Sequence, residues 1–314
     1  QGDAHVRDTI ANYINKKFGT DITKDNIYMT CGAAASLTIV LNAIMEKDEE
    51  CIVFTPFFPE YTIFIKESGA KVVQVPGEEG TFQIDMEKFE AAVNEKTKAV
   101  IVNSPNNPSG VVYSEETIVK MCDILRKKEK EYGHPIFLIT DEPYRELVYD
   151  DIDVPYMINY YDTFVCYSYS KALSLPGERI GYIVVSNKMV DSKDAYAAVC
   201  GAGRVLGYVC APSLFQKVIE RCIDDTADIS IYKTNRDLLY NSLTEMGFEC
   251  VYPDGAFYLF VKAMEDDAKA FCEKAKEQEL LLVPADSFGT PGYVRVSYCV
   301  QTEQIERALP AFKK

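Results

Sequence analysis

Short apolar runs rich in β-branched residues alternate with amphipathic stretches over the first two thirds of the chain. The apolar runs predict strands at residues 52–55, 71–75, 99–103, 136–140, 164–167 and 180–184. Helical periodicity predicts helices between them at residues 33–45, 86–94 and 115–132. Because strands that alternate with helices build a parallel sheet covered on both faces, we expect a three-layer α/β/α fold with a mainly parallel seven-stranded sheet.

The last third of the sequence has a different character. A long helical stretch, about 224–246, leads into candidate strands at 249–252, 256–261, 280–283 and 293–298, with a charged helix at 266–278 and a terminal helix. A chain of 314 residues is long enough for two domains of about 150 residues each. We therefore expect a large domain, residues 1–232, and a small α+β domain, residues 233–314.

Composition excludes several classes of function. The chain carries 48 acidic and 33 basic residues, and a net charge of -15 would repel nucleic acid and anionic lipid. No run of about 18 apolar residues predicts a membrane span. The 10 cysteines form no CxxC pair and favour a reduced, cytoplasmic protein, and with only 2 histidines we expect no metal site.

The segment YSYSKALSLPGERIG, residues 167–181, is the most informative one. Lys171 follows a predicted strand, at the edge where open α/β sheets bind their ligands. Ser168 and Arg179 add a hydroxyl and a guanidinium group, which suit a phosphate, and nearby positive charge lowers the pKa of a lysine and favours Schiff-base chemistry. The alternatives are a solvated surface lysine and, for Arg179, an ordinary ion pair at a strand end.

Two further polar segments follow predicted strands. In NSPNNPSG, residues 103–110, Asn107 precedes a proline and could present its amide to a ligand, although a rigid turn explains the composition equally well. In DEPY, residues 141–144, a buried Asp141 would need a cationic partner such as a pyridinium nitrogen. The alternative for Asp141 is a helix N-cap.

Two weaker signals complete the set. TCGAAASL, residues 30–37, passes from a short strand through Gly32 into an apolar helix, whose first backbone amides could bind an anion. PFFPEY, residues 56–61, could be core, but Phe58 could also stack on a flat ring.

In order and spacing, these segments resemble the class I/II aminotransferases, which are fold type I enzymes dependent on pyridoxal 5'-phosphate (PLP), over essentially the whole chain. The resemblance implies that Lys171 holds PLP as a Schiff base and that Asp141 pairs with the pyridine nitrogen. It implies that Tyr144 and Asn107 bind the phenolate oxygen of the ring and that Phe58 stacks on it. The freed lysine would then act as general base and acid at the substrate Cα.

The resemblance also supplies binding roles. The phosphate site would comprise Gly32, Ala33, Ala34, Ser168 and Arg179. Arg295, in YVRVSYC, would clamp the substrate carboxylate with the help of Asn107. Ala34 stands where some aspartate-using relatives have a lysine, so the sequence does not favour aspartate as the substrate. Family members carry a further N-terminal arm that contacts a partner subunit, and we expect residues upstream of an opening helix that lacks a convincing cap.

Alternative functions make distinct predictions. Gly201, Gly203 and Gly207 fit a GxGxxxG dinucleotide pattern, but no strand is predicted before them. A PLP-dependent β-C-S lyase of the cystathionine or cysteine type would share the fold and the lysine. The aminotransferase-like sensor domain of some transcription regulators is a non-enzymatic alternative, which the intact Lys171 and Arg295 disfavour.

The sequence therefore predicts a cytoplasmic, homodimeric PLP-dependent aminotransferase of amino-acid metabolism. It would move an amino group between an L-amino acid and a 2-oxoacid.

Overall fold

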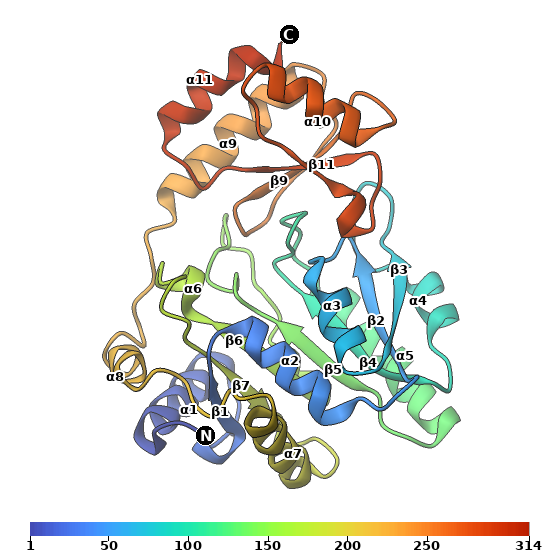
Figure 1. The fold of residues 1–314 in the computed structure, drawn as a ribbon, viewed down its shortest axis with the longest axis vertical. Coiled ribbons are helices and arrows are strands. Elements are labelled where there is room, and N and C mark those ends of the chain that lie inside the picture. Colours follow the sequence, from blue (N-terminus) through green and yellow to red (C-terminus); the bar gives the residue numbers. More distant parts are fainter. Residues whose placement is uncertain (314) are drawn as a thin grey trace.

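Seven strands build the larger of two sheets in the computed structural model, which describes residues 1–313 (Figure 1). Their order across the sheet is β1-β7-β6-β5-β4-β2-β3. Strands β2 to β6 are parallel, whereas β7 runs antiparallel to both of its neighbours. The strands are β1 Ile27–Thr30, β2 Glu50–Thr55, β3 Lys71–Pro76, β4 Thr97–Asn103, β5 Phe137–Asp141, β6 Thr163–Ser168 and β7 Gly181–Val185. The predicted mainly parallel α/β sheet is confirmed.

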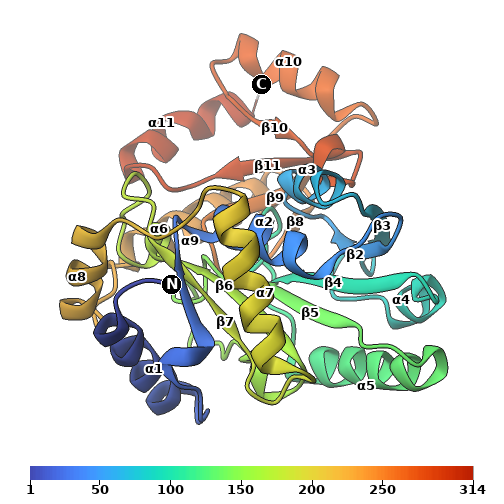
Figure 2. The same ribbon diagram turned by 60° about the horizontal axis from the view of Figure 1, so that its bottom comes forward.

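Helices bury both faces of this sheet, which explains why its strands read as continuous apolar runs. Alternate residues of β2 enter opposite cores: Ile52 packs with residues of α5, and Val53 packs with residues of α2. Figure 2 shows α5 and the pair α2 and α7 on opposite sides of the sheet. The helices of this part are α1 Ala4–Phe18, α2 Ala33–Ile44, α3 Glu60–Glu67, α4 Met86–Ala92, α5 Glu115–Tyr132, α6 Tyr169–Ala172, α7 Ser192–Val205 and α8 Ser213–Arg221.

A second, antiparallel sheet of four strands lies at the top of Figure 1, in the order β10-β11-β9-β8. Three helices share a hydrophobic core with it. The elements are α9 Ser230–Glu245, β8 Cys250–Val251, β9 Tyr258–Lys262, α10 Ala268–Glu277, β10 Val283–Pro284, β11 Tyr293–Ser297 and α11 Thr302–Phe312. We propose that residues 1–232 and 233–314 form the two domains, with the boundary in the first turn of α9.

Three local expectations were wrong. The helix predicted from about residue 224 begins only at Ser230. The segment before it makes a hydrogen bond outside the helix, because the backbone N–H of Ala227 donates to the carbonyl of Ala172 at 2.6 Å. The opening helix has a cap, since the Asp3 carboxylate accepts from two backbone N–H groups of the first turn. Helices α3, α6, α7 and α8 were not predicted.

The dinucleotide pattern is not a phosphate-binding turn. Gly201 and Gly203 lie inside α7. A Cβ atom on Gly203 would come within 2.5 Å of the Tyr28 hydroxyl oxygen, so this glycine allows α7 to pack against β1. The glycine spacing reflects helix packing, and the prediction against a nucleotide site there agrees with the structure.

Arg236 of α9 connects the C-terminal part of the chain to the loop after β5. Its guanidinium group is only 1% exposed and pairs with the carboxylates of Asp150 and Asp237, each at 2.7 Å. The group also lies 4.7 Å from the ring centroid of Tyr149 and 4.9 Å from that of Tyr252. A planar cation between two aromatic rings and two carboxylates makes a well-satisfied buried contact.

We expect Arg236→Met to lower the free energy of unfolding by about 2–3 kcal/mol, because it removes a buried hydrogen-bonded cation from this contact. Lys233→Met is the matched control: Lys233 pairs with the same Asp150, but its side chain is 45% exposed. The control should cost less than about 1 kcal/mol. Urea denaturation of both variants measures the difference, and equal losses would contradict a special role for Arg236.

Candidate active site

Three parallel strands end at one edge of the large sheet and bring polar residues together there. Asn103 ends β4, Asp141 ends β5 and Ser168 ends β6. Asn103 and Asp141 are register partners in the ladder between their strands. Ligands of open α/β sheets bind at this carboxyl edge.

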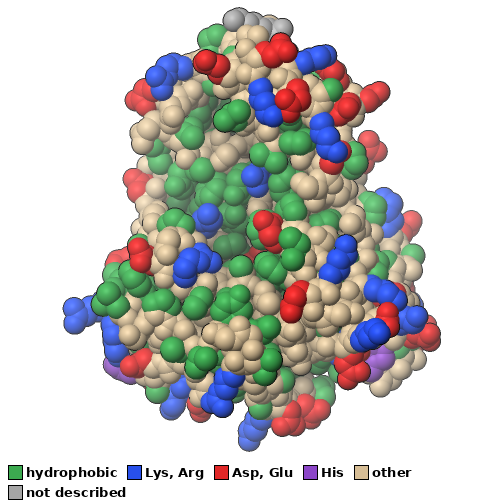
Figure 3. Space-filling view, viewed as in Figure 1, with side chains coloured by type: hydrophobic (Ala, Val, Ile, Leu, Met, Phe, Trp, Pro, Cys, Tyr) green, Lys and Arg blue, Asp and Glu red, His purple; other side chains and the backbone are tan. Residues whose placement is uncertain are grey.

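A pocket of about 380 Å³ opens at this edge. Every residue predicted for the site lines it except Gly32, which lies directly behind Arg179. Figure 3 shows this face of the molecule hollowed between the two sheets, with hydrophobic side chains and a few Lys or Arg side chains in the hollow. The lining also includes six residues that the sequence analysis did not single out: Leu37, Asn103, Pro143, Ser170, Pro176 and Tyr258.

Lys171 lies on the short helix α6 and has no acidic partner among residues 1–313. Its side chain is partly buried, and its Nζ is 5.2 Å from the ring centroid of Phe257. Burial lowers the pKa of Lys171, and the positive charge of Arg179 lowers it further. Both effects favour the neutral amine, which is the form that attacks a carbonyl carbon.

An anion site lies beside the lysine. Gly32 caps α2 without a side-chain hydrogen bond, so the first amides of this helix remain available. A Cβ atom on Gly32 would lie 2.7 Å from Arg179 Nη2, so only glycine permits this approach. Arg179 has a left-handed backbone with φ of 51°, a strained conformation that is common at functional sites. Ser168 Oγ and Ser170 Oγ are 2.8 Å apart, and Arg179 Nη1 donates to Ser170 Oγ at 3.4 Å.

The alternatives for Arg179 and Asp141 fail. No acidic side chain among residues 1–313 pairs with Arg179, and β7 begins two residues after it, at Gly181. Residues 142–148, directly after Asp141, form turns and a bridge rather than a helix, which excludes an N-cap. The Asp141 side chain is 5% exposed, and its Oδ2 accepts a hydrogen bond from the Tyr61 hydroxyl at 2.6 Å.

Asp141 is not satisfied by the protein alone. Its Oδ1 has no hydrogen-bond partner among the described residues. Burial raises the pKa of this carboxyl group to about 7, although the hydrogen bond from Tyr61 lowers it. A cationic partner at Oδ1 would restore the ionised form. An unpaired carboxylate, an amine and an anion site in one pocket fit PLP, which has a basic ring nitrogen, an aldehyde and a phosphate.

Arg295 reaches the pocket from β11 of the small sheet. Its Nη1 donates to Asn107 Oδ1 at 2.9 Å, and its buried Nε has no partner among the described residues. The guanidinium lies 4.5 Å from the Tyr258 ring centroid and 5.1 Å from that of Phe288. A guanidinium held on its faces and free along one edge can bind a carboxylate through two donors.

Asn103 and Tyr258, which the sequence did not point to, make hydrogen bonds to predicted site residues. Asn103 accepts from the backbone N–H of Asn107 at 2.7 Å and donates to the backbone carbonyl of Asp141 at 2.8 Å. The hydroxyl groups of Tyr258 and Tyr144 lie 3.2 Å apart. Asn103 was visible as the last residue of a predicted strand, but no local pattern indicates that Tyr258 reaches this edge.

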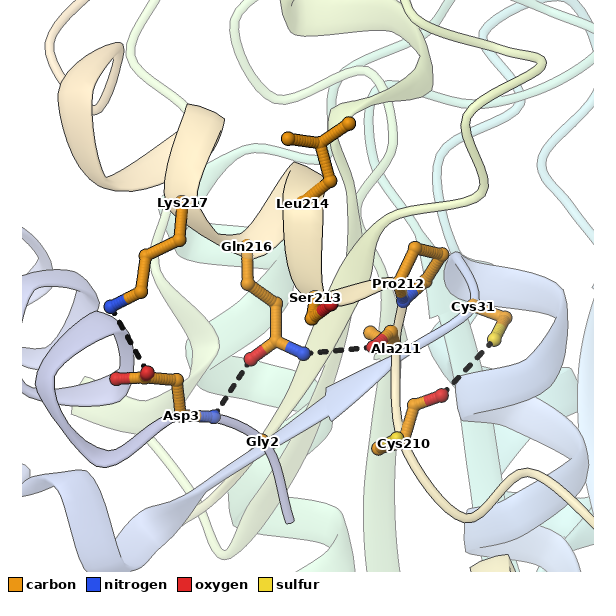
Figure 4. A pocket seen from close by; sticks show the side chains of 10 residues that line it. All are labelled: Gly2, Asp3, Cys31, Cys210, Ala211, Pro212, Ser213, Leu214, Gln216 and Lys217. Atoms are coloured by element: carbon orange, nitrogen blue, oxygen red, sulfur yellow. Dashed lines mark hydrogen bonds and ion pairs between the residues drawn. The ribbon is translucent and has the colours of Figure 1, made fainter.

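A larger hollow of about 830 Å³ near the N-terminus is less suited to a ligand (Figure 4). Its polar side chains have partners within the protein. Lys217 Nζ lies 3.0 Å from Asp3 Oδ2. The Gln216 side chain accepts from the Asp3 backbone N–H and donates to the Ala211 carbonyl. Cys31 Sγ faces the carbonyl oxygen of Cys210 at 3.9 Å. These groups satisfy one another, and none is left as a free charge.

Comparisons with known proteins agree with this geometry. The family model "Aminotransferase class I and II" matches residues 1–312. A probable aspartate aminotransferase of Methanocaldococcus jannaschii is 30% identical over 323 residues, which cover 100% of this chain and 83% of that protein. The aspartate aminotransferase of Thermotoga maritima is 32% identical, with 98% of this chain and 80% of the relative covered.

Solved structures give the same result. A crystal structure of an aminotransferase from Eubacterium rectale matches with a TM-score of 0.98 and 58% identity, covering 100% of this chain and 79% of that one. A mutant of the aspartate aminotransferase of Thermus thermophilus matches with a TM-score of 0.89 and 26% identity, covering 99% and 86%. The chain therefore belongs to the class I and II aminotransferases, the PLP-dependent enzymes of fold type I.

Proposed function

We propose that Lys171 is the residue that binds PLP covalently and moves the proton during amino transfer between an L-amino acid and a 2-oxoacid. The observation that carries this proposal is a partly buried lysine that has no acidic partner among residues 1–313. It lies in the pocket that also holds Asp141, whose Oδ1 has no partner among the same residues. Bound PLP supplies an electron sink that stabilises negative charge at the substrate Cα. Lys171 Nζ would accept the Cα proton as general base and later return it as general acid.

The remaining residues hold the cofactor in place. Asp141 Oδ1 would face the ring nitrogen and keep it protonated, and Phe58 would cover one face of the ring. Tyr144 and Asn107 would donate to the phenolate oxygen; burial raises the pKa of Tyr144, so its hydroxyl stays a donor. The phosphate would take the site formed by Gly32, Ala33, Ala34, Ser168 and Arg179.

Arg295 would bind the substrate carboxylate, assisted by Asn107. Its Nη1 already holds the Asn107 amide oxygen, and its Nε has no partner among the described residues. Two contacts from a fixed guanidinium set the orientation of the Cα–H bond relative to Lys171. The wall beside the cofactor carries Ala34 and no further cation, so we propose no preference for aspartate.

We further propose a cytoplasmic homodimer. The segment at residues 205–214 carries three apolar side chains in an exposed setting, with Val205 88%, Val209 57% and Leu214 69% exposed. Such a surface is typical of a contact with a second copy of the chain. All 10 cysteines are free thiols, as in a reducing compartment. No helix in the described part of the chain is long and apolar enough to cross a membrane.

Borohydride reduction of the full chain loaded with PLP should attach the cofactor to Lys171 and to no other lysine. Among the lysines of residues 1–313, this amine alone combines partial burial with a lowered pKa. Peptide mapping by mass spectrometry identifies the labelled residue. Lys171→Ala should abolish labelling, whereas the surface control Lys217→Ala should keep it. Label on another lysine in the unmodified chain would contradict the proposal.

Arg295→Lys should raise KM for the amino donor about 100-fold while kcat changes less. The substitution keeps the positive charge but loses the planar pair of donors, a difference of about 2–3 kcal/mol. Arg307→Lys, on an exposed face of α11, is the matched control and should leave both constants unchanged. An unchanged KM in Arg295→Lys would remove this residue from the substrate site.

An amino-donor screen with 2-oxoglutarate tests the reaction itself. We expect glutamate to form from at least one L-amino acid other than aspartate, and no pyruvate or ammonia to be released from cystathionine without an oxoacid. Cystathionine cleavage without glutamate formation from any donor would instead identify a β-C-S lyase, which nothing in the comparisons favours.

A further inference from the structure

Tyr61 of α3 contacts two residues of the proposed cofactor site without lining the pocket itself. Its hydroxyl donates to Asp141 Oδ2 at 2.6 Å, and its ring meets the Phe58 ring edge-on, with centroids 5.6 Å apart and planes at 79°. The side chain is 2% exposed, so water does not compete for the hydroxyl. No other group among residues 1–313 donates to the Asp141 carboxylate.

We propose that Tyr61 is a positioning residue for PLP. Its hydroxyl holds one oxygen of Asp141 so that the other is presented to the ring nitrogen, and its ring supports Phe58 against the ring face. This inference rests on the proposed role of Asp141 and adds the residue through which the fold sets the orientation and charge of that carboxylate.

The geometry requires such a residue. A carboxylate at a strand end can rotate about its Cβ–Cγ bond, so the direction of its oxygens is not defined unless one of them is hydrogen-bonded. The hydrogen bond from Tyr61 removes this freedom and leaves Oδ1 as the oxygen without a protein partner. Tyr61 contacts both the Asp141 carboxylate and the Phe58 ring. Because Tyr61 lies on α3, this helix positions both groups.

The hydrogen bond from Tyr61 also acts on the pKa of Asp141, which burial and a neighbouring charge raise. Burial raises the pKa of Asp141, the hydrogen bond from Tyr61 lowers it, and the charge of Glu142 raises it. Glu142 is itself paired with buried Arg145 at 2.5 Å. Tyr61 has a pKa well above its usual value, mainly through burial, and therefore remains a donor. The other titratable groups near Asp141 are Tyr144 and Cys166, whose pKa values burial also raises.

A double-mutant cycle of Tyr61→Phe and Asp141→Asn in the full chain tests the proposal with two readouts other than activity. The first is the PLP dissociation constant, measured by titration of the apoenzyme. Tyr61→Phe should weaken binding about 10- to 100-fold, as expected for one hydrogen bond to a charged group. It should have little further effect in the Asp141→Asn background, where no carboxylate remains to be held.

The second readout is the stability difference between Asp141→Asn and the parent chain as a function of pH, without PLP. The pKa of Asp141 in the folded protein, about 7, lies above the ordinary pKa of an aspartate in an unfolded chain, so ionisation disfavours folding. The parent chain should lose stability relative to Asp141→Asn as the pH rises from about 4, and the loss should level off near pH 7. In the Tyr61→Phe background the loss of stability should level off at a higher pH, because the hydrogen bond that lowers the pKa of Asp141 is missing.

Tyr156→Phe is the matched control, since it also removes a buried tyrosine hydroxyl, but one that has no partner among the described residues. It should change neither the PLP affinity nor the pH at which the stability difference levels off. The proposal would be contradicted if the effects of Tyr61→Phe and Asp141→Asn on PLP affinity were additive and the pH profile were unchanged. Tyr61 would then only fill space. An unchanged PLP affinity in Asp141→Asn alone would contradict the proposed role of Asp141. This result differs from the additive effects that would contradict the role of Tyr61, so the experiment separates the two cases.

Discussion

The carboxyl group of Asp141 ends the central strand of the large sheet, where burial makes its ionised form costly and one of its oxygens has no partner. Other features of the pocket are arranged around this group. Tyr61 binds its second oxygen, Asn103 holds its backbone carbonyl, and Phe58 lies beside Tyr61. A buried carboxylate of this kind lowers stability on its own and favours a cationic ligand. In the role that we propose for Asp141, affinity for the cofactor would therefore come at the expense of stability.

Two sheets contribute opposite ends of the pocket. The large sheet supplies the carboxyl edge, with the lysine and the anion site, whereas β11 of the small sheet carries Arg295. Aromatic rings of the small sheet and its neighbouring loop support that guanidinium, and Asn107 of the loop after β4 accepts from it. The contact of Arg236 with Asp150 joins the same two parts at a distance from the pocket. The proposed substrate contact of Arg295 would therefore depend on how the two parts meet.

Much of this arrangement was predictable from the sequence. Continuous apolar runs identified the strands buried on both faces, and polar residues directly after them identified the sheet edge. Contacts between distant segments were not predictable: Tyr61 meets Asp141 across 80 positions, and Tyr258 meets Tyr144 across 114. The helices α3 and α8 were missed because they are only 8 and 9 residues long, too short for a periodic pattern to separate them from strands or loops. Ala227 shows how one tertiary hydrogen bond overrides a helical pattern. The role of Arg295 came from family resemblance, since a lone arginine in a strand carries no local signal.

The most direct test of this account is the protonation state of the cofactor's ring nitrogen. The ¹⁵N chemical shift of PLP labelled at that atom, measured in the reconstituted full chain between pH 6 and pH 9, reports whether the nitrogen carries a proton. We expect a protonated nitrogen throughout, because Asp141 would pair with it in a buried site. A neutral nitrogen in this range would show that Asp141 does not pair with the cofactor, and the assignment of the pocket around it would be wrong.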